Sequence, residues 1–331
     1  MQLLRKIAYP FSWIYQVVVA IRNLMYDIGW FSSQTTTTPT VCVGNLSVGG
    51  TGKTPMVEFL IATLKDSHKL AVLSRGYGRK SKGFFMASSN STVETLGDEP
   101  YQIYSKFPGV ALAVDVNRLN GVRLLKEKVN PDIIILDDAF QHRKIKPHLS
   151  ILLTAYNQLY SDDCYLPTGD LRDSRSQAKR ANYIIVTKCP PNLTKTQRQE
   201  LKARLQPKPY QQVLFSYLAY SSTLGGFQNK LTLNDLKEKE VTLVTGIAKP
   251  EPLVNYLKEQ GISFEHLRYK DHHFFTEKQV TMLTTKTCVL TTEKDYMRLD
   301  GKIKQLGYIG VKHVFYEDGK TNLSQAIKAL K

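Results

Sequence analysis

One glycine-rich segment constrains the fold of this chain more than any other. Residues 44 to 55 read GNLSVGGTGKTP; an apolar run over 41 to 43 precedes them, and a helical stretch over 53 to 66 overlaps their end. A strand, a glycine-rich loop and a helix in this order are typical of a phosphate-binding loop, because the helix N-terminus presents free N–H groups to an anion. The usual pattern has glycine five places before Gly52, where this chain has Ser47. The remaining glycines still let the backbone wrap closely around phosphate oxygens.

This segment is predicted to bind a nucleotide. Lys53 can reach the β and γ phosphates, and the hydroxyl of Thr54 can bind Mg²⁺. A guanine-specific site would have Asp where the segment TKCP has Pro190, so ATP is expected rather than GTP. The predicted ATP-binding residues are Ser47, Val48, Gly49, Gly50, Thr51, Gly52, Lys53 and Thr54.

A second segment, PDIIILDDAFQHR, carries two neighbouring carboxylates. Its apolar run is typical of a buried parallel strand and ends in Asp137 and Asp138. A carboxylate at the end of a strand beside a phosphate loop is where Mg²⁺ is held. The predicted metal residues are therefore Thr54, Asp137 and Asp138, and the two aspartates are expected to have different roles because neighbouring residues of a strand point to opposite sides. The alternative is a surface Asp pair in a turn.

Short apolar runs alternate with helix-length segments along the chain. This pattern indicates a parallel sheet covered by helices on both faces, so the expected fold is α/β and P-loop NTPase-like, with a second, smaller α/β domain joined by a β linker. The expected strands are 41–43, 70–73, 110–114, 133–136, 149–153, 183–187, 241–244, 264–269, 289–291 and 314–316, and clear helices are expected over 53–66 and 117–129. The expected units are an N-terminal helix (1–31), a nucleotide-binding domain (40–206), a β linker (207–230) and a C-terminal domain (231–331).

Residues 3 to 31 are unusually apolar. The longest uncharged run, 7 to 21, is shorter than the roughly 20 apolar residues that a membrane-spanning helix needs. Two interpretations stay open: a helix packed on the protein's own core, or an amphipathic helix lying in a membrane interface. Basic flanking residues favour the second, because anionic lipid attracts them. The helical stripe consists of Leu4, Ile7, Phe11, Ile14, Val18, Ile21, Met25 and Ile28.

The chain is basic, with 45 Lys and Arg against 29 Asp and Glu and a net charge of +16. Such a surface suits an anionic partner, although a generally basic soluble protein is the alternative. No basic–aromatic stripe or known module indicates nucleic-acid binding, so no nucleic-acid partner is expected. The cysteines show no paired spacing, which argues against a disulfide framework or a zinc site. They are Cys42, Cys164, Cys189 and Cys288.

Two classes of phosphate-loop protein combine such a loop with membrane association. Deviant-loop ATPases of the partitioning type carry K-G-G-x-G-K-T, and VGGTGKT is close to it, but their signature lysine is here Val48. The second class is a lipid kinase, and a series of short motifs favours it. In order, these are VGNLSVGGTGKTP, SRGYGR, GDEP, VNRLNG, LDDAFQHR, LPTGDLRDS, VTGIAKPEPL, KDHHFFT and TTEKD. From residue 41 to about 300, the ordered set resembles the tetraacyldisaccharide 4'-kinases, the lipid A kinases of Gram-negative bacteria.

The resemblance implies transfer of the ATP γ-phosphate, with Mg²⁺, to the 4'-hydroxyl of tetraacyldisaccharide 1-phosphate, an anionic glycolipid. It also implies a peripheral or monotopic protein at the cytoplasmic face of the bacterial inner membrane. Carried onto this sequence, it assigns Asp98 as catalytic base and His272 as its partner from the second domain, with His273 as a neighbouring alternative. Lys53 and Asp138 complete the catalytic set. The implied cleft residues are Arg75, Tyr77, Glu99, Arg118, Gln141, His142, Arg172 and Asp173.

One departure from the family pattern concerns the segment 169 to 174. The family usually reads G-P-L-R-E-P, and this chain has Asp173 in place of the glutamate, a carboxylate one methylene shorter. If that group holds the metal or the loop, its reach is altered. Because Asp98 and His272 come from different expected domains, closure of the two domains is expected to complete the site.

Overall fold

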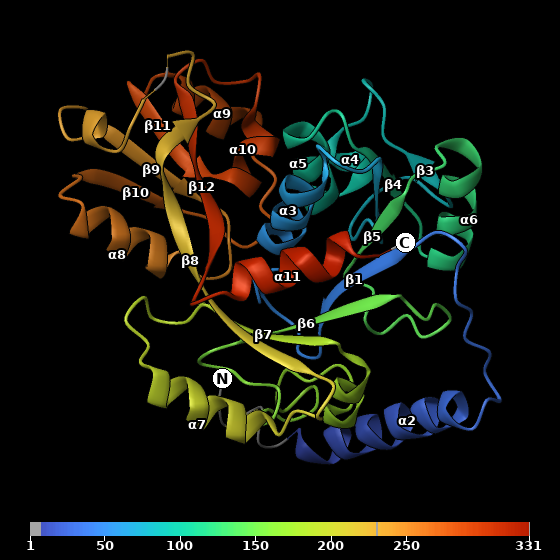
Figure 1. The fold of residues 1–331 in the computed structure, drawn as a ribbon. Coiled ribbons are helices and arrows are strands. Elements are labelled where there is room, and N and C mark those ends of the chain that lie inside the picture. The colour runs from blue at the N-terminus through green and yellow to red at the C-terminus, as the bar shows by residue number, and fades with distance from the viewer. Residues whose placement is uncertain (1–7, 230, 331) are drawn as a thin grey trace.

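The computed structural model describes residues 8–229 and 231–330 and shows an α/β fold built on one continuous sheet (Figure 1). Over these residues the sheet has twelve strands, in the order β10-β9-β11-β12-β8-β7-β6-β1-β5-β2-β4-β3. The strands are β1 (Thr40–Asn45), β2 (Leu70–Ser74), β3 (Phe85–Met86), β4 (Ala111–Val114), β5 (Ile133–Asp137), β6 (Leu149–Ala155), β7 (Tyr183–Thr187), β8 (Gln212–Gly225), β9 (Val241–Thr245), β10 (Phe264–Arg268), β11 (Cys288–Thr292) and β12 (Leu306–Phe315). The helices are α2 (Tyr9–Asp27), α3 (Lys53–Leu64), α4 (Val93–Leu96), α5 (Asp98–Lys106), α6 (Arg118–Lys128), α7 (Lys195–Leu205), α8 (Glu251–Glu259), α9 (Glu277–Thr284), α10 (Glu293–Leu299) and α11 (Gly319–Lys328), with short 3-10 helices η1 (Arg175–Arg180) and η2 (Asn234–Leu236).

We call β1 to β7 with helices α3 to α7 the first lobe, and β9 to β11 with helices α8 to α10 the second lobe. In the first lobe, all strands except the edge strand β3 run parallel. Strand β1 is buried on both faces: Val41 and Val43 point into one core cluster and Cys42 into the other. Helices α3 and α5 cover the first cluster, and α6 and α7 cover the second. The expected parallel sheet with helices on both faces is confirmed.

Two long strands, β8 and β12, join the lobes. Strand β8 first pairs in parallel with β7 and then, from Ser216 onward, antiparallel with β12, which continues the sheet into β11. The sequence predicted only 314–316 of β12, but the strand begins at Leu306. Position 307, inside this strand, requires glycine because a Cβ there would come within 1.9 Å of the Phe227 ring. A glycine required by this close approach hides the strand pattern.

The last helix, α11, packs in the first lobe and not with the second-lobe elements that precede it. Leu323 and Ile327 belong to the same buried cluster as Met56 and Leu60 of α3. The chain therefore returns from the second lobe to the first at its end (Figure 1). The domain boundaries given above stay a prediction, and α11 lies outside the second lobe.

Helix α2 has the opposite side-chain distribution to an ordinary surface helix, which buries its apolar face. Two of its buried side chains, Ser12 and Asn23, are polar, whereas large apolar side chains face outward. The stripe predicted for this helix is thus mainly exposed over its described part, and Leu4 and Ile7 lie outside the described residues. No helix in the described part of the chain has the length and apolar character needed to cross a membrane. The exposed apolar side chains on and just after α2 are Tyr9, Phe11, Trp13, Ile14, Val17, Val18, Ile21, Leu24, Ile28, Trp30 and Phe31.

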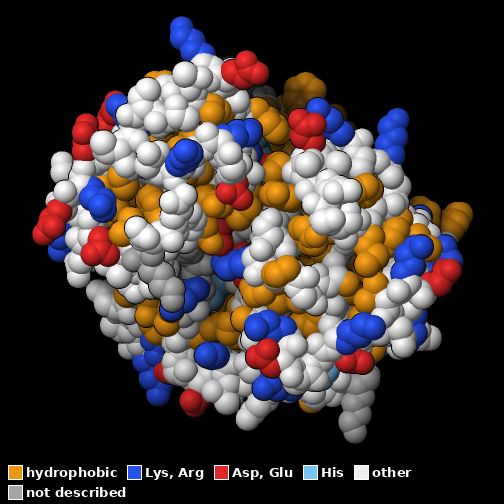
Figure 2. Space-filling model, turned by 90° about the horizontal axis from the view of Figure 1, so that it is seen from above, with side chains coloured by type: hydrophobic (Ala, Val, Ile, Leu, Met, Phe, Trp, Pro, Cys, Tyr) orange, Lys and Arg blue, Asp and Glu red, His pale blue; other side chains and the backbone are white. Residues whose placement is uncertain are grey.

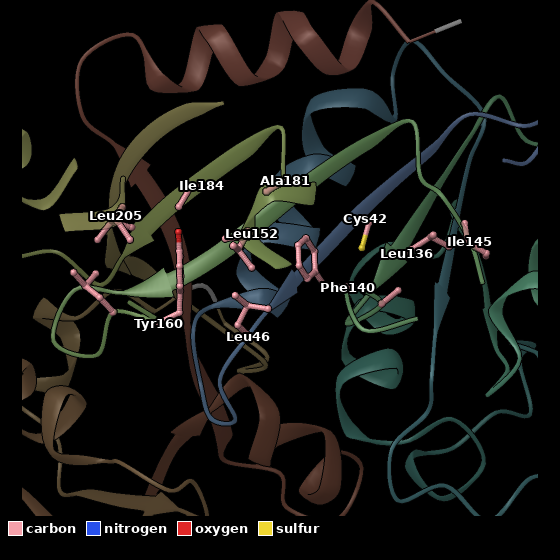
Figure 3. Packing of buried hydrophobic residues seen from close by; sticks show 14 of the residues in the cluster. Cys42, Leu46, Leu136, Phe140, Ile145, Leu152, Tyr160, Ala181, Ile184 and Leu205 are labelled. Carbon is pink, nitrogen blue, oxygen red and sulfur yellow. The ribbon is translucent and has the colours of Figure 1, made fainter. Parts of the chain in front are cut away.

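Phe140 anchors the segment that follows β5. It is fully buried in one cluster with Cys42, Leu46 and Leu152 (Figure 3). Gly44 makes room for it, since a Cβ on Gly44 would lie 2.5 Å from the Phe140 Cβ. The acidic pair just before Phe140 is therefore held beside the start of the glycine-rich loop.

Candidate active site

The candidate active site lies where the carboxyl ends of β1, β5 and β2 meet. Strand β5 pairs in parallel with both β1 and β2, so Asn45, Asp137 and Ser74 end neighbouring strands at one edge of the sheet. In parallel α/β sheets this edge is where ligands bind. Helix α3 begins at Lys53, directly after the loop. Viewed from above, the surface is hollowed near its centre, and basic and acidic side chains lie in that hollow (Figure 2).

Ser47 is tolerated in the loop because its position does not require glycine. In the described part of the chain, Ser47 is not among the residues with positive φ, whereas Gly49 and Gly52 have φ values of 106° and 86°. The Ser47 hydroxyl donates to Asp163 Oδ2 at 2.8 Å, and Val48 N donates to a backbone carbonyl of the segment 164 to 174 at 2.7 Å. These two hydrogen bonds therefore hold the first part of the loop against a segment that lies outside it.

Asn45 connects the loop to two other segments. Its side-chain amide donates to Thr51 Oγ1 at 3.0 Å, and its side-chain oxygen accepts from Lys53 Nζ at 3.3 Å and from Arg172. Gln141 donates to the Asn45 carbonyl at 2.7 Å. Asn45 was not predicted from the sequence, where it is only a polar residue at the end of a mainly apolar strand.

Asp138 lies among basic side chains. Arg172 contacts both of its carboxylate oxygens, with 3.1 Å from Nη1 to Oδ2, and Lys53 Nζ lies 3.7 Å from Oδ1. Arg118 donates to the Asp138 carbonyl at 3.2 Å. Burial acts to raise the Asp138 pKa, but the charges of Lys53 and Arg172 outweigh it and lower the pKa. The predicted residues Lys53, Asp138, Arg118, Gln141 and Arg172 thus form one group.

Asp137 lies in a different environment from its neighbour. It is buried and accepts a hydrogen bond from Ser74 Oγ at 2.8 Å. Burial and the nearby Asp138 charge raise its pKa to about 6. A divalent cation would stabilise the ionised form of such a carboxylate. With the Thr54 hydroxyl on the first turn of α3, the donors are all oxygen, which suits Mg²⁺ because that ion uses few protein carboxylates and completes its shell with water and phosphate oxygens.

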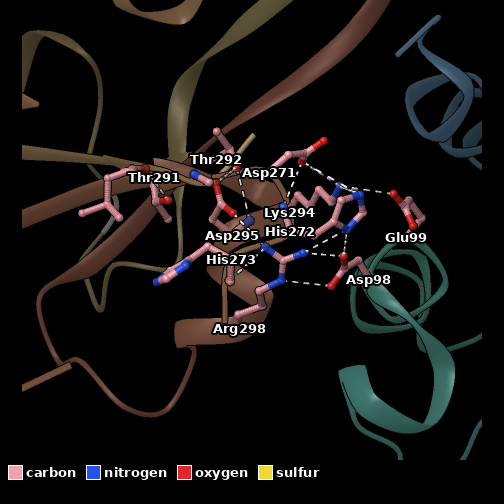
Figure 4. Close-up of polar contacts among 12 residues, drawn as sticks. Asp98, Glu99, Asp271, His272, His273, Thr291, Thr292, Lys294, Asp295 and Arg298 are labelled. Atoms are coloured by element: carbon pink, nitrogen blue, oxygen red, sulfur yellow. Dashed lines mark hydrogen bonds and ion pairs between the residues drawn. The ribbon is translucent and has the colours of Figure 1, made fainter. Parts of the chain in front are cut away.

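Asp98 and His272 meet across the two lobes (Figure 4). Asp98 begins α5, His272 follows β10, and His272 Nδ1 lies 2.6 Å from Asp98 Oδ2. This hydrogen bond raises the His272 pKa, although burial opposes the shift. His272 has a φ of 58°, a conformation uncommon for residues with a side chain and frequent at functional sites. His273 instead contacts Gln279 Oε1 at 2.9 Å, so His272 is the histidine that reaches Asp98.

Two basic residues of α10 surround this pair. Lys294 Nζ lies 3.1 Å from His272 Nε2 and 3.4 Å from Glu99 Oε1. Arg298 donates from Nε to Asp98 Oδ1 at 3.0 Å and from Nη2 to Oδ2. Neither residue was predicted from the sequence, although the TTEKD motif contains Lys294 and ends three residues before Arg298.

Tyr77, another of the predicted cleft residues, lies close to this pair. Its ring centroid is 6.4 Å from that of His272, and it belongs with the exposed Arg75 to the loop after β2. Gly97 packs against this loop, because a Cβ there would lie 2.7 Å from the Tyr77 carbonyl oxygen. His142 is partly buried; burial, and secondarily Arg118, lowers its pKa to about 4.

Asp173 lies apart from these groups. It is fully buried, accepts a hydrogen bond from Asn23 Nδ2 of α2 at 2.8 Å, and lies 4.0 Å from Arg180 Nη2. The structure therefore does not bring Asp173 to Lys53 or Asp138. Its carboxylate connects α2 to the segment before η1.

His313 of β12 contacts the loop from outside the first lobe. Its Nε2 lies 2.9 Å from the Gly52 carbonyl, and since a carbonyl only accepts, Nε2 carries the hydrogen. Nδ1 then accepts from Ser216 Oγ at 3.0 Å. Burial lowers the His313 pKa to about 4, so the ring is neutral. Nothing in the sequence pattern pointed to this contact.

Comparison with known proteins agrees with this geometry. The family model described as "Tetraacyldisaccharide-1-P 4'-kinase" matches residues 4–330. The tetraacyldisaccharide 4'-kinase of Flavobacterium johnsoniae is 47% identical over 95% of this chain and 94% of its own length, and that of Bacteroides thetaiotaomicron is 43% identical over 89% and 83%. The crystal structure of LpxK from Aquifex aeolicus in complex with ATP superposes with a TM-score of 0.82, at 31% identity and 98% coverage of both chains. The chain belongs to the tetraacyldisaccharide-1-P 4'-kinase family.

Proposed function

We propose a residue-level account of how this chain works as a tetraacyldisaccharide 4'-kinase. The reaction transfers the γ-phosphoryl group of ATP to the 4'-hydroxyl of tetraacyldisaccharide 1-phosphate in lipid A biosynthesis, with Mg²⁺ as the metal. The observation that carries the account is the Asp98–His272 contact, 2.6 Å long, next to Glu99, whose charge acts on Asp137 at the carboxyl end of β5. A substrate hydroxyl held between this pair and the glycine-rich loop would have a proton acceptor on one side and the terminal phosphate of ATP on the other.

The first-lobe group acts on ATP. Backbone N–H groups of the loop and the ammonium of Lys53 bind the phosphates and offset their charge. Thr54, Asp137 and Asp138 would hold Mg²⁺, which adds positive charge next to the transferred group. Arg172 is already paired with Asp138, so it keeps that carboxylate in place beside Lys53.

The second group acts on the sugar hydroxyl. As the oxygen–phosphorus bond forms, the bond between the γ-phosphorus and the ADP oxygen breaks, ADP leaves, and the hydroxyl proton passes to the Asp98–His272 pair. A positioned proton acceptor contributes about 10²–10⁴-fold in general acid–base catalysis. Because the pair joins α5 to the loop after β10, the two lobes must be together for this step.

Helix α2 supports a position at the membrane surface. Its outward face carries Trp13, which is 65% exposed, beside aliphatic side chains, and Trp30, just after the end of the helix, is 74% exposed. Aromatic and apolar side chains on one face of a helix suit an interfacial position in the bilayer. On the other face, Tyr15 donates to the Arg172 carbonyl at 3.0 Å and Arg22 to the Gln141 carbonyl, so the helix connects directly to the site. We infer that α2 docks on the cytoplasmic face of the inner membrane and brings the site to its glycolipid substrate.

The partitioning-type ATPase receives no support from these observations. Val48 occupies the position of that class's signature lysine, and the chain belongs to the kinase family. The deciding experiment incubates pure protein with labelled ATP, Mg²⁺ and tetraacyldisaccharide 1-phosphate. A bis-phosphorylated lipid is expected. ATP hydrolysis on bare vesicles without any lipid product would contradict the kinase function.

The membrane position is tested by vesicle co-sedimentation. The double variant Trp13→Ser/Trp30→Ser is expected to lose binding to vesicles that contain anionic lipid. Met282→Ser, which removes an exposed apolar side chain from α9 of the second lobe, serves as the matched control and should bind normally. Unchanged sedimentation of the double variant would remove the docking proposal and leave the kinase activity in place.

A further inference from the structure

We propose that His313 is a positioning residue for ATP binding: by holding the Gly52 carbonyl, it directs the N–H group of Lys53 toward the phosphates. This inference rests on the ATP-binding role that the proposed function gives to the glycine-rich loop. It adds to that loop a residue of β12, one of the two strands that join the lobes.

The contact connects the His313 ring to the last glycine of the loop. Nε2 donates to the Gly52 carbonyl at 2.9 Å, and Nδ1 accepts from Ser216 Oγ at 3.0 Å, so both ring nitrogens have partners. The side chain is 7% exposed, and a Cβ on Gly52 would lie 3.1 Å from Nε2. The ring therefore packs directly against the backbone that leads into α3.

The two joining strands hold this ring in place. Ser216 lies on β8, and His313 pairs with Leu218 of the same strand in the antiparallel ladder. Two residues further along β12, the ring centroid of Phe315 lies 5.0 Å from that of Phe59 in α3. The imidazole thus reaches the loop from a pair of strands that also packs against the helix after the loop.

The bound carbonyl fixes the direction of the next N–H group. In a planar trans peptide, the carbonyl oxygen and the amide hydrogen point to opposite sides. The Gly52 carbonyl accepts from His313 and, at 3.1 Å, from Met56 N. The N–H group of Lys53 belongs to the same peptide and therefore points the other way, out of the start of α3. The first N–H groups of a helix have no partner within it, so this donor is available to an anion.

The preceding peptide of the loop is held in the same manner. Thr187 Oγ1, at the end of β7, donates to the Thr51 carbonyl at 2.8 Å, which fixes the direction of the Gly52 N–H group. Thr187 is buried, as His313 is. Two successive peptides are thus oriented by buried side chains on their carbonyl sides. Successive oriented N–H groups are the arrangement that binds phosphate in such loops.

The charge state of His313 suits a fixed donor. Burial lowers its pKa to about 4, although the hydrogen bond to Gly52 opposes the shift, so the ring is neutral and carries one N–H hydrogen. That hydrogen is directed at the Gly52 carbonyl. A neutral ring with partners on both nitrogens has no free donor for a phosphate, so its effect on ATP acts through the loop backbone.

The experiment compares two substitutions that replace different ring nitrogens. His313→Gln places an amide N–H near the position of Nε2, so it can still reach the Gly52 carbonyl. His313→Asn reaches only the position of Nδ1 and keeps a partner for Ser216. We expect His313→Asn to weaken ATP binding about tenfold, the scale of one hydrogen bond to a charged group, and His313→Gln to bind nearly as the wild type does. Isothermal titration of the full chain with ATP and Mg²⁺ measures both.

Steady-state kinetics separates positioning from a general loss of structure. In His313→Asn the KM for ATP should rise while the KM for tetraacyldisaccharide 1-phosphate stays unchanged, whereas a merely structural role would lower the melting temperature without this split. Phe315→Leu is the matched control. It weakens the packing of β12 on α3 but removes no hydrogen bond, so it should lower the melting temperature and leave ATP affinity unchanged.

Three results would overturn the inference: wild-type ATP affinity in His313→Asn, equal losses in His313→Asn and His313→Gln, or the same loss in Phe315→Leu. Should His313→Asn fail to fold, His313→Met takes its place in the comparison, because methionine has the reach of glutamine without a donor. Titration with ATP requires no lipid, so it tests His313 independently. Absence of the bis-phosphorylated lipid with wild-type protein would contradict the kinase function instead.

Discussion

The two halves of the cleft are built in different ways. The half that we propose binds phosphate, called the phosphate half, comes from one lobe, where Asn45, Lys53 and Asp138 lie together. The half that we propose accepts the proton, called the proton-accepting half, comes from two lobes, and Asp98 and His272 are 174 residues apart in the chain. The first half follows from the geometry of a parallel sheet, whereas the second depends on how β8 and β12 fix one lobe against the other. Substitutions in the two halves should therefore change different kinetic constants.

The largest effect is expected in the phosphate half. Lys53→Met removes the ammonium that faces Asp138 and that we propose binds the phosphates of ATP, so kcat/KM for ATP should fall by about 10³-fold, as when one preorganised charge-stabilising donor is lost. Steady-state kinetics with varied ATP measures it. Lys65→Met, just after the end of the same helix, is the control and should be neutral. A loss below tenfold would mean that the loop binds phosphate without Lys53.

A smaller and more selective effect is expected in the proton-accepting half. Asp98→Ala should lower kcat by about 10²-fold, the lower end for a positioned acceptor, because the imidazole of His272 remains. The affinity for ATP should be retained, because Asp98 does not contact the residues of the phosphate half. Isothermal titration with ATP and turnover with lipid check both. Asp66→Ala, whose side chain is 84% exposed, is the control, and equal losses of ATP affinity and turnover would place Asp98 in the other half.

The pH dependence sharpens the same contrast. The hydrogen bond to Asp98 raises the His272 pKa above its usual 6.5, so the neutral, proton-accepting ring is lost as the pH falls through this raised value. Below it, kcat/KM should fall about tenfold per pH unit. Asp98→Asn removes the charge that raises the His272 pKa, so the acidic limb of the pH profile of kcat/KM should move to lower pH. If the acidic limb of kcat/KM does not move in Asp98→Asn, the group that titrates is not His272.

The structure brings together the residues predicted for the phosphate half, because the sequence signals that identified them are local. The run 41 to 43, the loop and the start of α3 at Lys53 follow one another in the chain, and the acidic pair ends a plain apolar strand. Asn45 was still missed, because nothing in a single sequence distinguishes a connecting amide from an ordinary residue at a strand end.

The two-lobe half was predicted only through the family resemblance. Asp98 and His272 have no local pattern that joins them, and Arg298 could not be assigned because its partner lies 200 residues earlier. The position of Asp173 was also not predictable: its burial against Asn23 depends on how α2 docks, with polar side chains inward. Contacts of this kind depend on tertiary packing, which the periodicity of a segment does not record.

The smallest effect is expected at the residue that departs from the usual phosphate loop. Ser47 needs no left-handed backbone, and its hydroxyl braces the loop against Asp163 at 2.8 Å. Ser47→Gly should therefore leave kcat unchanged and lower stability by about 1–2 kcal/mol, from one lost hydrogen bond and the added freedom of the unfolded chain. Urea unfolding measures the loss, and Ser47→Ala separates the hydroxyl from the backbone contribution. A gain in kcat in Ser47→Gly would show that the serine limits the loop, and the loop would then need glycine for its motion and not for its resting shape.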